Sequence, residues 1–285
     1  MSKIKNNSCV VTFLYPQSEK FIKQFVSCLE KQTYKKFDVL FFCEKFDLNN
    51  LNFKINLKYR CFNVSGTIPQ IRQKSIKRLN LLHYKKIFFC DSDDLFKSNR
   101  IEILNDLLNK NKIVFNDIDC FNKKKLIKKN FLSYFFNNNQ KINYKHLYHQ
   151  NFLGFSNTAF KTEILKKIKL PNLSKKVNIY DWYFWSIMLK KNNACFTNKT
   201  KTYYNTVSSS YTCLPIKLTK KYLVNSILVK YNFYRAMRKE GKRYKKMYLN
   251  CSNLYTNKIK LLKLIKTLIL NKKNKYFSWW GGIEL

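Results

Sequence analysis

Three carboxylates stand within four residues of one another in a chain that has few of them. The sequence holds 56 lysine and arginine residues against 16 aspartate and glutamate residues, yet Asp91, Asp93 and Asp94 occur together in the stretch KKIFFCDSDDLF. Crowded carboxylates disfavour each other's charge unless a cation or hydrogen-bond donors compensate. In an extended segment Asp91 and Asp93 would project to the same side, as two ligands of one Mg²⁺ or Mn²⁺ ion do. The cluster predicts a divalent metal site. The alternative is a turn in which Asp94 caps the following helix.

The few glycines exclude the common phosphate-binding loops. Glycine occurs only at positions 66, 154, 241, 281 and 282, and these positions form neither a GxGxxG nor a Walker-type loop. If the protein binds a nucleotide, its phosphates must be neutralised in another way. A divalent cation held by aspartates would do this.

The acid cluster follows directly on one of several short apolar runs, which alternate with helical patterns. Runs typical of buried strands cover residues 9–15, 37–43, 59–64 and 86–90, and the helical patterns cover 18–32 and 69–82. This alternation predicts an α/β fold with a mostly parallel sheet. Ligands of such sheets bind beyond the carboxyl ends of the strands, which is where the cluster is expected.

The rest of the chain divides into a core part and a basic part. Expected in order are a helix over 98–110, an exposed excursion over 123–143, a strand or turn entering a helix over 154–168, an apolar helix over 179–191 and a last strand region over 200–212. Residues 1–215 are therefore predicted to form the main domain, with 216–285 as a basic helical extension. Within the extension, residues 257–270 carry leucine and isoleucine on one face and lysine on the other. They form either a helix docked on the domain or one lying on an anionic membrane, in which case 256–280 would make the contact.

The net charge of +40 has two explanations. It suits a polyanionic partner, either nucleic acid or phospholipid, and it also suits a composition rich in Lys, Asn, Ile, Phe and Tyr such as A/T-rich codons produce. The aromatic residues lie mostly in apolar runs and do not alternate with lysine as a base-stacking surface would. This distribution argues against nucleic acid as the partner.

Cysteine usage and the lack of long apolar runs indicate a cytoplasmic protein. The nine cysteines form no CxxC pair, and their odd number argues for reduced thiols. The start of the sequence has no signal-peptide pattern, and no run approaches the ~18 apolar residues of a membrane span. The predicted localisation is cytoplasmic, with peripheral attachment at the inner face of the membrane if the basic helices bind lipid.

Four stretches, in this order and spacing, resemble family 2 glycosyltransferases. They are CVVTFLYPQSEKFIKQFVSCLEKQTYKKFDVLFF, GTIPQIRQKSIKRLN with YKKIFFCDSDD, FLGFSNTAFKTEIL and IYDWYFWSIMLKK. The resemblance extends over residues 9–212. It implies a GT-A fold, which is a Rossmann-like, mostly parallel mixed sheet flanked by helices. Such a fold binds a nucleotide-diphosphate sugar at the strand ends.

The resemblance also implies roles for individual residues. Asp91 would lie near the nucleotide ribose, Asp93 would ligate the metal that bridges the diphosphate, and Asp94 would support or share that role. Arg72 matches the family's arginine near the nucleotide; the alternative is a surface arginine of a helix. Asp181 matches the family's catalytic aspartate, which as a general base would take the proton of the attacking sugar hydroxyl. The alternative for Asp181 is a plain helix N-cap.

The chain departs from the family pattern at several positions. CEKF replaces the common DDGS, so Glu44 is the only nearby acid for the base, and the nucleotide is open. Tyr180 stands where the family has glutamate before the catalytic aspartate. His149 is a candidate for the acceptor side. Trp182 either stacks on a sugar or belongs to the core. His146 and His149 have the HxxH spacing of some zinc ligands, but no third ligand of a suitable type stands close to them in the sequence.

Together these features predict a metal-dependent, inverting glycosyltransferase. It would move a sugar from a nucleotide-diphosphate sugar, with UDP the expected nucleotide, to a hydroxyl of a glycan or glycolipid, as in polysaccharide or lipopolysaccharide biosynthesis. The required cofactor is Mn²⁺ or Mg²⁺, which offsets charge on the departing diphosphate. Two alternatives remain: a non-catalytic polyanion-binding protein, and a catalytically degenerate transferase relative.

Overall fold

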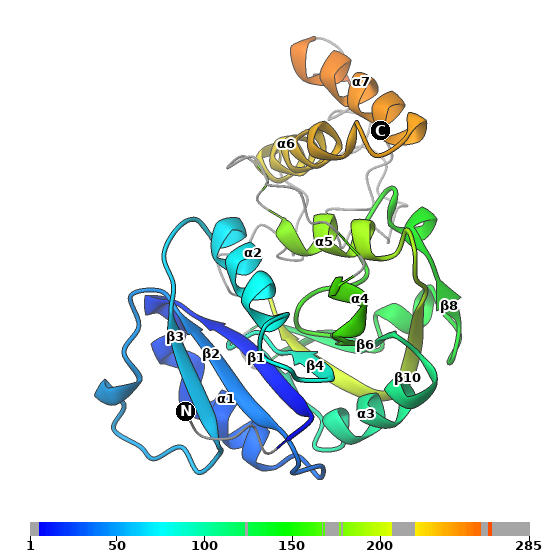
Figure 1. Ribbon diagram of the computed structural model, residues 1–285. Helices are drawn as coiled ribbons and strands as arrows, with labels where there is room; N and C mark the ends of the chain where they lie inside the picture. The colour runs from blue at the N-terminus through cyan, green and yellow to red at the C-terminus, as the bar shows by residue number, and fades with distance from the viewer. Residues whose placement is uncertain are drawn as a thin grey trace.

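A computed structural model describes residues 6–122, 125–166, 168, 177, 179–206, 220–257, 262 and 263. Its centre is a twisted sheet with helices on both faces and a pair of helices stacked at one end (Figure 1). In the described part of the chain the sheet has ten strands, eight of them in the order β3-β2-β1-β4-β9-β6-β10-β5. The predicted α/β class is confirmed.

The first half of the sheet is parallel. Strands β1 (Ser8–Leu14), β2 (Asp38–Cys43), β3 (Tyr59–Asn63) and β4 (Lys86–Phe89) pair in the order β3-β2-β1-β4. Helices α1 (Glu19–Glu30) and α2 (Ile68–Leu79) connect β1 to β2 and β3 to β4. Every residue of β1 and β2 is buried, as central parallel strands require, whereas the residues of the edge strand β3 are exposed or half-buried.

The second half of the sheet is mixed. Strand β9 (Thr158–Lys161) runs antiparallel to β4 and to β6 (Ile113–Asn122), and β10 (Ala194–Asn205) runs parallel to β6 and pairs with the short β5 (Leu95–Phe96). Helices α3 (Arg100–Lys110), α4 (Glu163–Lys166) and α5 (Tyr180–Met188) complete the layers. Strand β6, which the sequence analysis missed, is buried at its first eight positions.

The segment 123–143 was predicted as an exposed excursion. It contains β7 (Lys125–Lys128), the 3₁₀ helix η3 (Leu132–Tyr134) and β8 (Lys141–Ile142). The prediction holds for β7, whose residues are mostly exposed, but it is wrong for the part from Phe131 to Ile142, which anchors several side chains in the core. Phe131, Leu132 and Phe136 are buried. The carboxylate of Asp117 holds the segment in place, since it accepts hydrogen bonds from Leu132 N at 2.7 Å and from Ser133 Oγ at 2.6 Å.

Two apolar layers fill the space between sheet and helices. One layer joins the sheet to α1 and α3, and the other joins it to α2 and α5. The second layer is rich in aromatic rings, with Phe155 stacked on Phe89 at 4.2 Å between centroids. It extends from the strand ends to α5, and so fixes the helix that carries Asp181.

The basic extension contains two helices, α6 (Lys220–Met237) and α7 (Lys242–Thr256); α6 lies over α5, and α7 packs on α6 (Figure 1). The ring of Phe233 lies flat on Trp182, with 3.5 Å between centroids and 7° between planes. Lys190 of the loop after α5 pairs with Glu240 between the two helices. The predicted amphipathic segment 257–270 lies outside the described residues, except for 257, 262 and 263. Within the described ranges, no helix has the length and apolarity that crossing a bilayer requires.

Candidate active site

The residues from Asp91 to Asp94, three of them aspartates, form a tight turn at the carboxyl end of β4. The backbone N–H of Asp94 donates to the carbonyl of Asp91 at 3.2 Å. Ser92, which is buried, donates its hydroxyl to Phe13 O at 3.4 Å and bonds to Ser18 Oγ at 3.0 Å. The turn is therefore held against the end of β1, and the predicted extended conformation of this segment is wrong.

Asp94 joins this turn to the far side of the sheet. Its side chain is 1% exposed, and Oδ1 accepts a hydrogen bond from the N–H of Asn205, the last residue of β10, at 2.7 Å. It does not cap α3, whose N-cap is Asn99. The other oxygen, Oδ2, is buried and has no partner within 3.5 Å among the described residues, and the Ser156 hydroxyl lies near enough to this carboxyl group to lower its pKa. Burial and the charges of Asp93 and Asp91 raise the pKa of Asp94.

Arg72 reaches from α2 to the first aspartate of the turn. Its Nη2 lies 3.4 Å from Asp91 Oδ1, and its guanidinium lies over the rings of Phe155 at 4.9 Å and Phe13 at 5.6 Å. Arg72 is therefore not a plain surface arginine. The pKa of Asp91 is raised to about 6 in total. Burial is the largest cause; Arg72 acts against it, and Asp93 and Asp181 add to it. Arg72, Asp93 and Asp181 thus all lie within electrostatic range of Asp91.

This raised pKa makes a prediction for stability. A carboxyl group whose pKa is higher in the folded than in the unfolded state stabilises the fold fully below its ordinary pKa, and loses that contribution as pH rises through the folded value. The asparagine of the Asp91→Asn variant cannot ionise, so the free energy of unfolding of this variant should rise relative to that of wild type as the pH is raised. The relative gain should reach about 3 kcal/mol between about pH 4 and about pH 6. Urea unfolding of both proteins without divalent metal measures this gain. A difference that stays constant over that range would contradict it.

Asp181 lies in the first turn of α5, opposite the aspartate turn. Its Oδ1 accepts a hydrogen bond from Trp182 N at 2.9 Å, and the N-cap of the helix is Ile179, so Asp181 is not a plain N-cap. Burial raises the pKa of Asp181, while Arg72 lowers it. Gly154 lies beside it: a Cβ at that position would be 3.9 Å from Asp181 Oδ2. The absence of a side chain at Gly154 leaves room beside this oxygen.

Glu44 and Tyr15 follow the ends of the neighbouring strands β2 and β1. Glu44 is half-buried, and its N–H donates to Leu14 O at 2.8 Å. Burial raises the pKa of Tyr15; Arg72 lowers it, and Asp91 and Glu44 raise it, so the phenol lies among these groups. Its hydroxyl has no hydrogen-bond partner within 3.5 Å in the described residues. The sequence analysis missed Tyr15, whose only signal was its position directly after the first strand.

A second residue that the sequence analysis missed is Arg100. It is completely buried beneath the aspartate turn, and donates to Asn116 Oδ1 at 2.8 Å, Cys90 Sγ at 3.0 Å and Phe89 O at 3.1 Å. Its charge lowers the pKa of Asp91. Arg100 therefore fixes the strand end from which the turn begins, and no sequence motif distinguishes it from the other cations of the chain.

The two acceptor-side candidates lie on the side of α6 and α7. Trp182 is completely buried: its Nε1 donates to Leu147 O at 2.7 Å, and its ring stacks on Phe233. The core alternative therefore holds for Trp182, and its ring is not available to stack on a sugar. His149 is half-buried, with Nε2 3.5 Å from Arg243 Nη2 on α7.

The donor set suits a metal that arrives together with a substrate. Within the described ranges, no three histidine, cysteine, aspartate or glutamate side chains are grouped as a complete metal site. Mg²⁺ and Mn²⁺ in nucleotide sites need only one or two carboxylates, because phosphate oxygens supply further ligands. Asp91 and Asp93 are both partly exposed, and fit that requirement.

No family model matches the chain, but two curated proteins and many solved structures are similar to it. It is 26% identical over 195 residues to the UDP-Glc:alpha-D-GlcNAc-diphosphoundecaprenol beta-1,3-glucosyltransferase WfgD of Escherichia coli, covering 66% of this chain and 73% of WfgD. It is 28% identical over 312 residues to Protein Ycf2 of Physcomitrium patens, but spans only 12% of that protein's length.

Among solved structures, S. aureus TarS 1–349 superposes with a TM-score of 0.57 at 15% identity, covering 92% of this chain and 78% of TarS. TarS has also been solved with UDP-GlcNAc. GalNAc-T7 with UDP, GalNAc and Mn²⁺ gives a TM-score of 0.58 at 12% identity, covering 97% of this chain and 56% of GalNAc-T7.

These likenesses define a GT-A-type glycosyltransferase fold with a helical C-terminal region, as the sequence predicted. Together with the match to WfgD, they support the resemblance of the chain to family 2 glycosyltransferases.

Proposed function

We propose that the protein transfers a sugar, with inversion, from a nucleotide-diphosphate sugar to a hydroxyl of a glycan or glycolipid. The observation that carries this proposal is the convergence of Arg72, Asp91, Asp93 and Asp181 at the carboxyl ends of the strands, close enough to perturb the pKa of Asp91. A carboxylate on α5, Asp181, would act on the hydroxyl that attacks. The carboxylates of the aspartate turn and the cation of Arg72 would act at the diphosphate that leaves.

Asp91 and Asp93 form the donor end of the proposed site. They would hold Mn²⁺ or Mg²⁺, which when bound offsets the charge that develops on the diphosphate. Asp94 supports the turn from behind, since its Oδ1 accepts a hydrogen bond from Asn205 N at 2.7 Å. Arg72 keeps Asp91 in place through their 3.4 Å contact.

Asp181 is the proposed general base. A sugar hydroxyl is a weak nucleophile, so a carboxylate must take its proton while the oxygen attacks the anomeric carbon. Trp182 N donates to Oδ1, and the side chain of Asn151 also bonds to this carboxylate and lowers its pKa, so both groups would orient the base. Burial raises the pKa of Asp181, which makes its carboxylate a stronger base than an ordinary exposed one.

Tyr15 and Glu44 are the proposed contacts of the nucleotide base, and UDP is the proposed nucleotide. Support comes from their place beyond β1 and β2, and from the UDP-Glc in the name of WfgD and the UDP in the TarS and GalNAc-T7 structures. Glu44 could accept a hydrogen bond from a uracil N–H, and Tyr15 brings a buried hydroxyl that lies beside Arg72.

The proposed acceptor is a glycolipid at the inner face of the membrane. WfgD is named for a diphosphoundecaprenol-linked acceptor. Helix α7 exposes Lys242, Arg243, Lys245 and Lys246, and each exposed cation near an anionic membrane adds about 1 kcal/mol of attraction. We propose that these side chains and residues 256–280 hold the protein at the membrane, and that 1–215 and 216–285 divide the sequence into catalytic and membrane-facing parts.

Thermal unfolding with UDP and UDP-sugars, each with and without Mn²⁺, tests the donor site. We expect Tm to rise with one UDP-sugar only when Mn²⁺ is present, since a ligand at about 100 times its Kd stabilises by about 2.7 kcal/mol. Asp93→Ala should abolish the metal-dependent part of this rise. A rise that is independent of Mn²⁺ and unchanged in Asp93→Ala would contradict the proposed metal role.

Turnover and salt dependence separate the remaining alternatives. A degenerate relative would bind the UDP-sugar without consuming it in the presence of any glycolipid acceptor. A polyanion-binding protein would bind RNA or anionic vesicles with a steep salt dependence, and this binding would survive substitution of Asp91, Asp93 and Asp181.

A further inference from the structure

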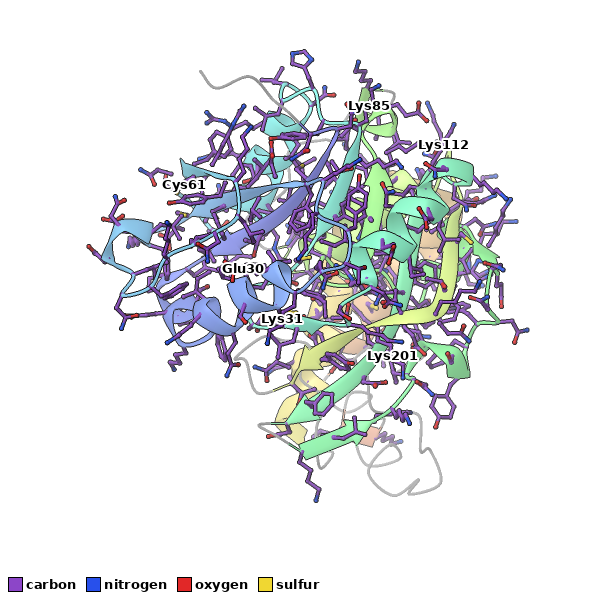
Figure 2. All side chains as sticks on the ribbon, turned by 90° about the horizontal axis from the view of Figure 1, so that it is seen from below. Glu30, Lys31, Cys61, Lys85, Lys112 and Lys201 are labelled. Carbon is purple, nitrogen blue, oxygen red and sulfur yellow. The ribbon has the colours of Figure 1, made fainter. Side chains whose placement is uncertain are left out.

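Two cysteines face each other across the outer strands of the sheet. Cys43 is the last residue of β2 and Cys61 is the middle residue of the edge strand β3, and their sulfur atoms are 3.0 Å apart. Figure 2 shows Cys61 at the rim of the sheet, away from the helices stacked on α5. This separation is shorter than an ordinary contact between two sulfur atoms, and is about 1 Å longer than the 2.05 Å of a disulfide bond.

The twist of the sheet produces this contact. In the strand register Cys43 lies opposite Asn63, and Cys61 lies opposite Phe41, so the two cysteines are diagonal neighbours. The same diagonal relation brings the Phe41 ring to 5.6 Å from that of Tyr59 on the same face of the sheet. The strand register therefore places the two side chains on the same face of the sheet, where their sulfur atoms can meet.

Only one of the two thiols is open to solvent. Among the eight cysteines in the described ranges, Cys61 is exposed, Cys28 is intermediate and the others are buried. The sulfur of Cys28 is engaged with the backbone of Phe96, at 3.1 Å from its N and 3.2 Å from its O. Burial and the neighbouring Cys61 thiol raise the pKa of Cys43. An oxidant in solution would therefore meet Cys61 first.

The structure assigns Cys43 and Cys61 as a dithiol modification site, which a two-electron oxidant such as a hydroperoxide converts to an intramolecular disulfide between β2 and β3. This inference does not depend on the proposed function.

The reaction takes two steps. The Cys61 sulfur attacks one oxygen of the hydroperoxide; the O–O bond breaks, an alcohol leaves with a proton, and Cys61 becomes a sulfenic acid. The Cys43 sulfur then attacks the Cys61 sulfur; the S–O bond breaks, and the hydroxyl leaves as water with the Cys43 proton. Each sulfur loses one electron, and the hydroperoxide gains two.

Peptide mapping of the full chain tests this assignment. Because Cys213 lies outside the described residues, the Cys213→Ser protein is the starting material. It is treated with tert-butyl hydroperoxide, its remaining thiols are alkylated after denaturation, and it is digested with trypsin. Cleavage after Lys36, Lys45, Arg60 and Arg72 separates the two cysteines. We expect peptides 37–45 and 61–72 to be joined by a bond that dithiothreitol reverses.

Two single variants provide the controls. Cys61→Ser changes an exposed side chain and should leave Cys43 as a free, alkylated thiol after oxidation. Cys28→Ser removes the other partly exposed thiol and should leave the linked peptides unchanged. The assignment is overturned if Cys61 in the starting protein is oxidised to sulfinic acid, or joined to a second chain, while Cys43 is recovered alkylated.

Discussion

Replacing Asp181 by asparagine is expected to lower kcat by about 10²–10⁴-fold, which is the usual contribution of a positioned general base. Asparagine retains an oxygen that can accept the hydrogen bond from Trp182 N, so the start of α5 should keep its conformation. It cannot take a proton from the acceptor hydroxyl. Release of UDP from the preferred UDP-sugar, followed with saturating glycolipid acceptor, measures the loss.

The matched control is Asp106→Asn, which changes an exposed aspartate on α3 and should leave kcat unchanged. The affinity of the Asp181→Asn variant for the UDP-sugar, measured by calorimetry, should stay within about threefold of wild type, because the base acts on the acceptor. Full turnover by Asp181→Asn would remove Asp181 from the mechanism.

Replacing Phe233 by alanine is expected to lower the free energy of unfolding by about 3–5 kcal/mol, the range for a large aromatic residue in a packed core. The Phe233 side chain is 1% exposed and stacks on Trp182, so its removal leaves a cavity between α6 and the helix of the proposed base. Denaturant unfolding followed by circular dichroism measures the change.

Leu249→Ala on α7 is the control for Phe233→Ala, because Leu249 is 56% exposed and its loss should change stability by less than about 0.5 kcal/mol. Equal stabilities of Phe233→Ala and wild type would contradict the docking of α6 on α5. A large loss in Leu249→Ala would indicate that its exposed face is covered in solution.

The fold could be predicted where one physical signal dominated. The strands around Val10, Leu40 and Phe88 are buried on both faces, so they appear in the sequence as unbroken apolar runs. Strand β6 was missed because Asp117 and Asp119 interrupt its apolar pattern. Asp117 bonds to the segment that was taken for an exposed excursion, and Asp119 pairs with Lys201. Apart from the bond from Ile118 N to Asp117, the partners of both acids lie eleven or more residues away in the sequence.

The candidate site was predictable as a set of residues, and less so in its geometry. The resemblance singled out Arg72, Asp91 and Asp181, which the structure brings close together. It could not show that the aspartates turn, or that Asp94 bonds to Asn205, because these contacts depend on how β10 returns to the centre of the sheet. Whether Trp182 was core or site depended on α6, which only a three-dimensional structure can supply.

The stacking of α6 on α5 limits how the gene can be shortened. A fragment that ends at residue 215 would lose Phe233 and Tyr234, whose rings cover Trp182. It would also lose the hydrogen bond that the Tyr234 hydroxyl donates to the carbonyl of Tyr148. Several aromatic rings next to α5 would then face water, and such a fragment would aggregate. Expression of residues 1–215 alone therefore requires polar substitutions on α5. Insertions are better tolerated in the surface loop after η2 (Leu48–Asn50) than where α5 and α6 meet.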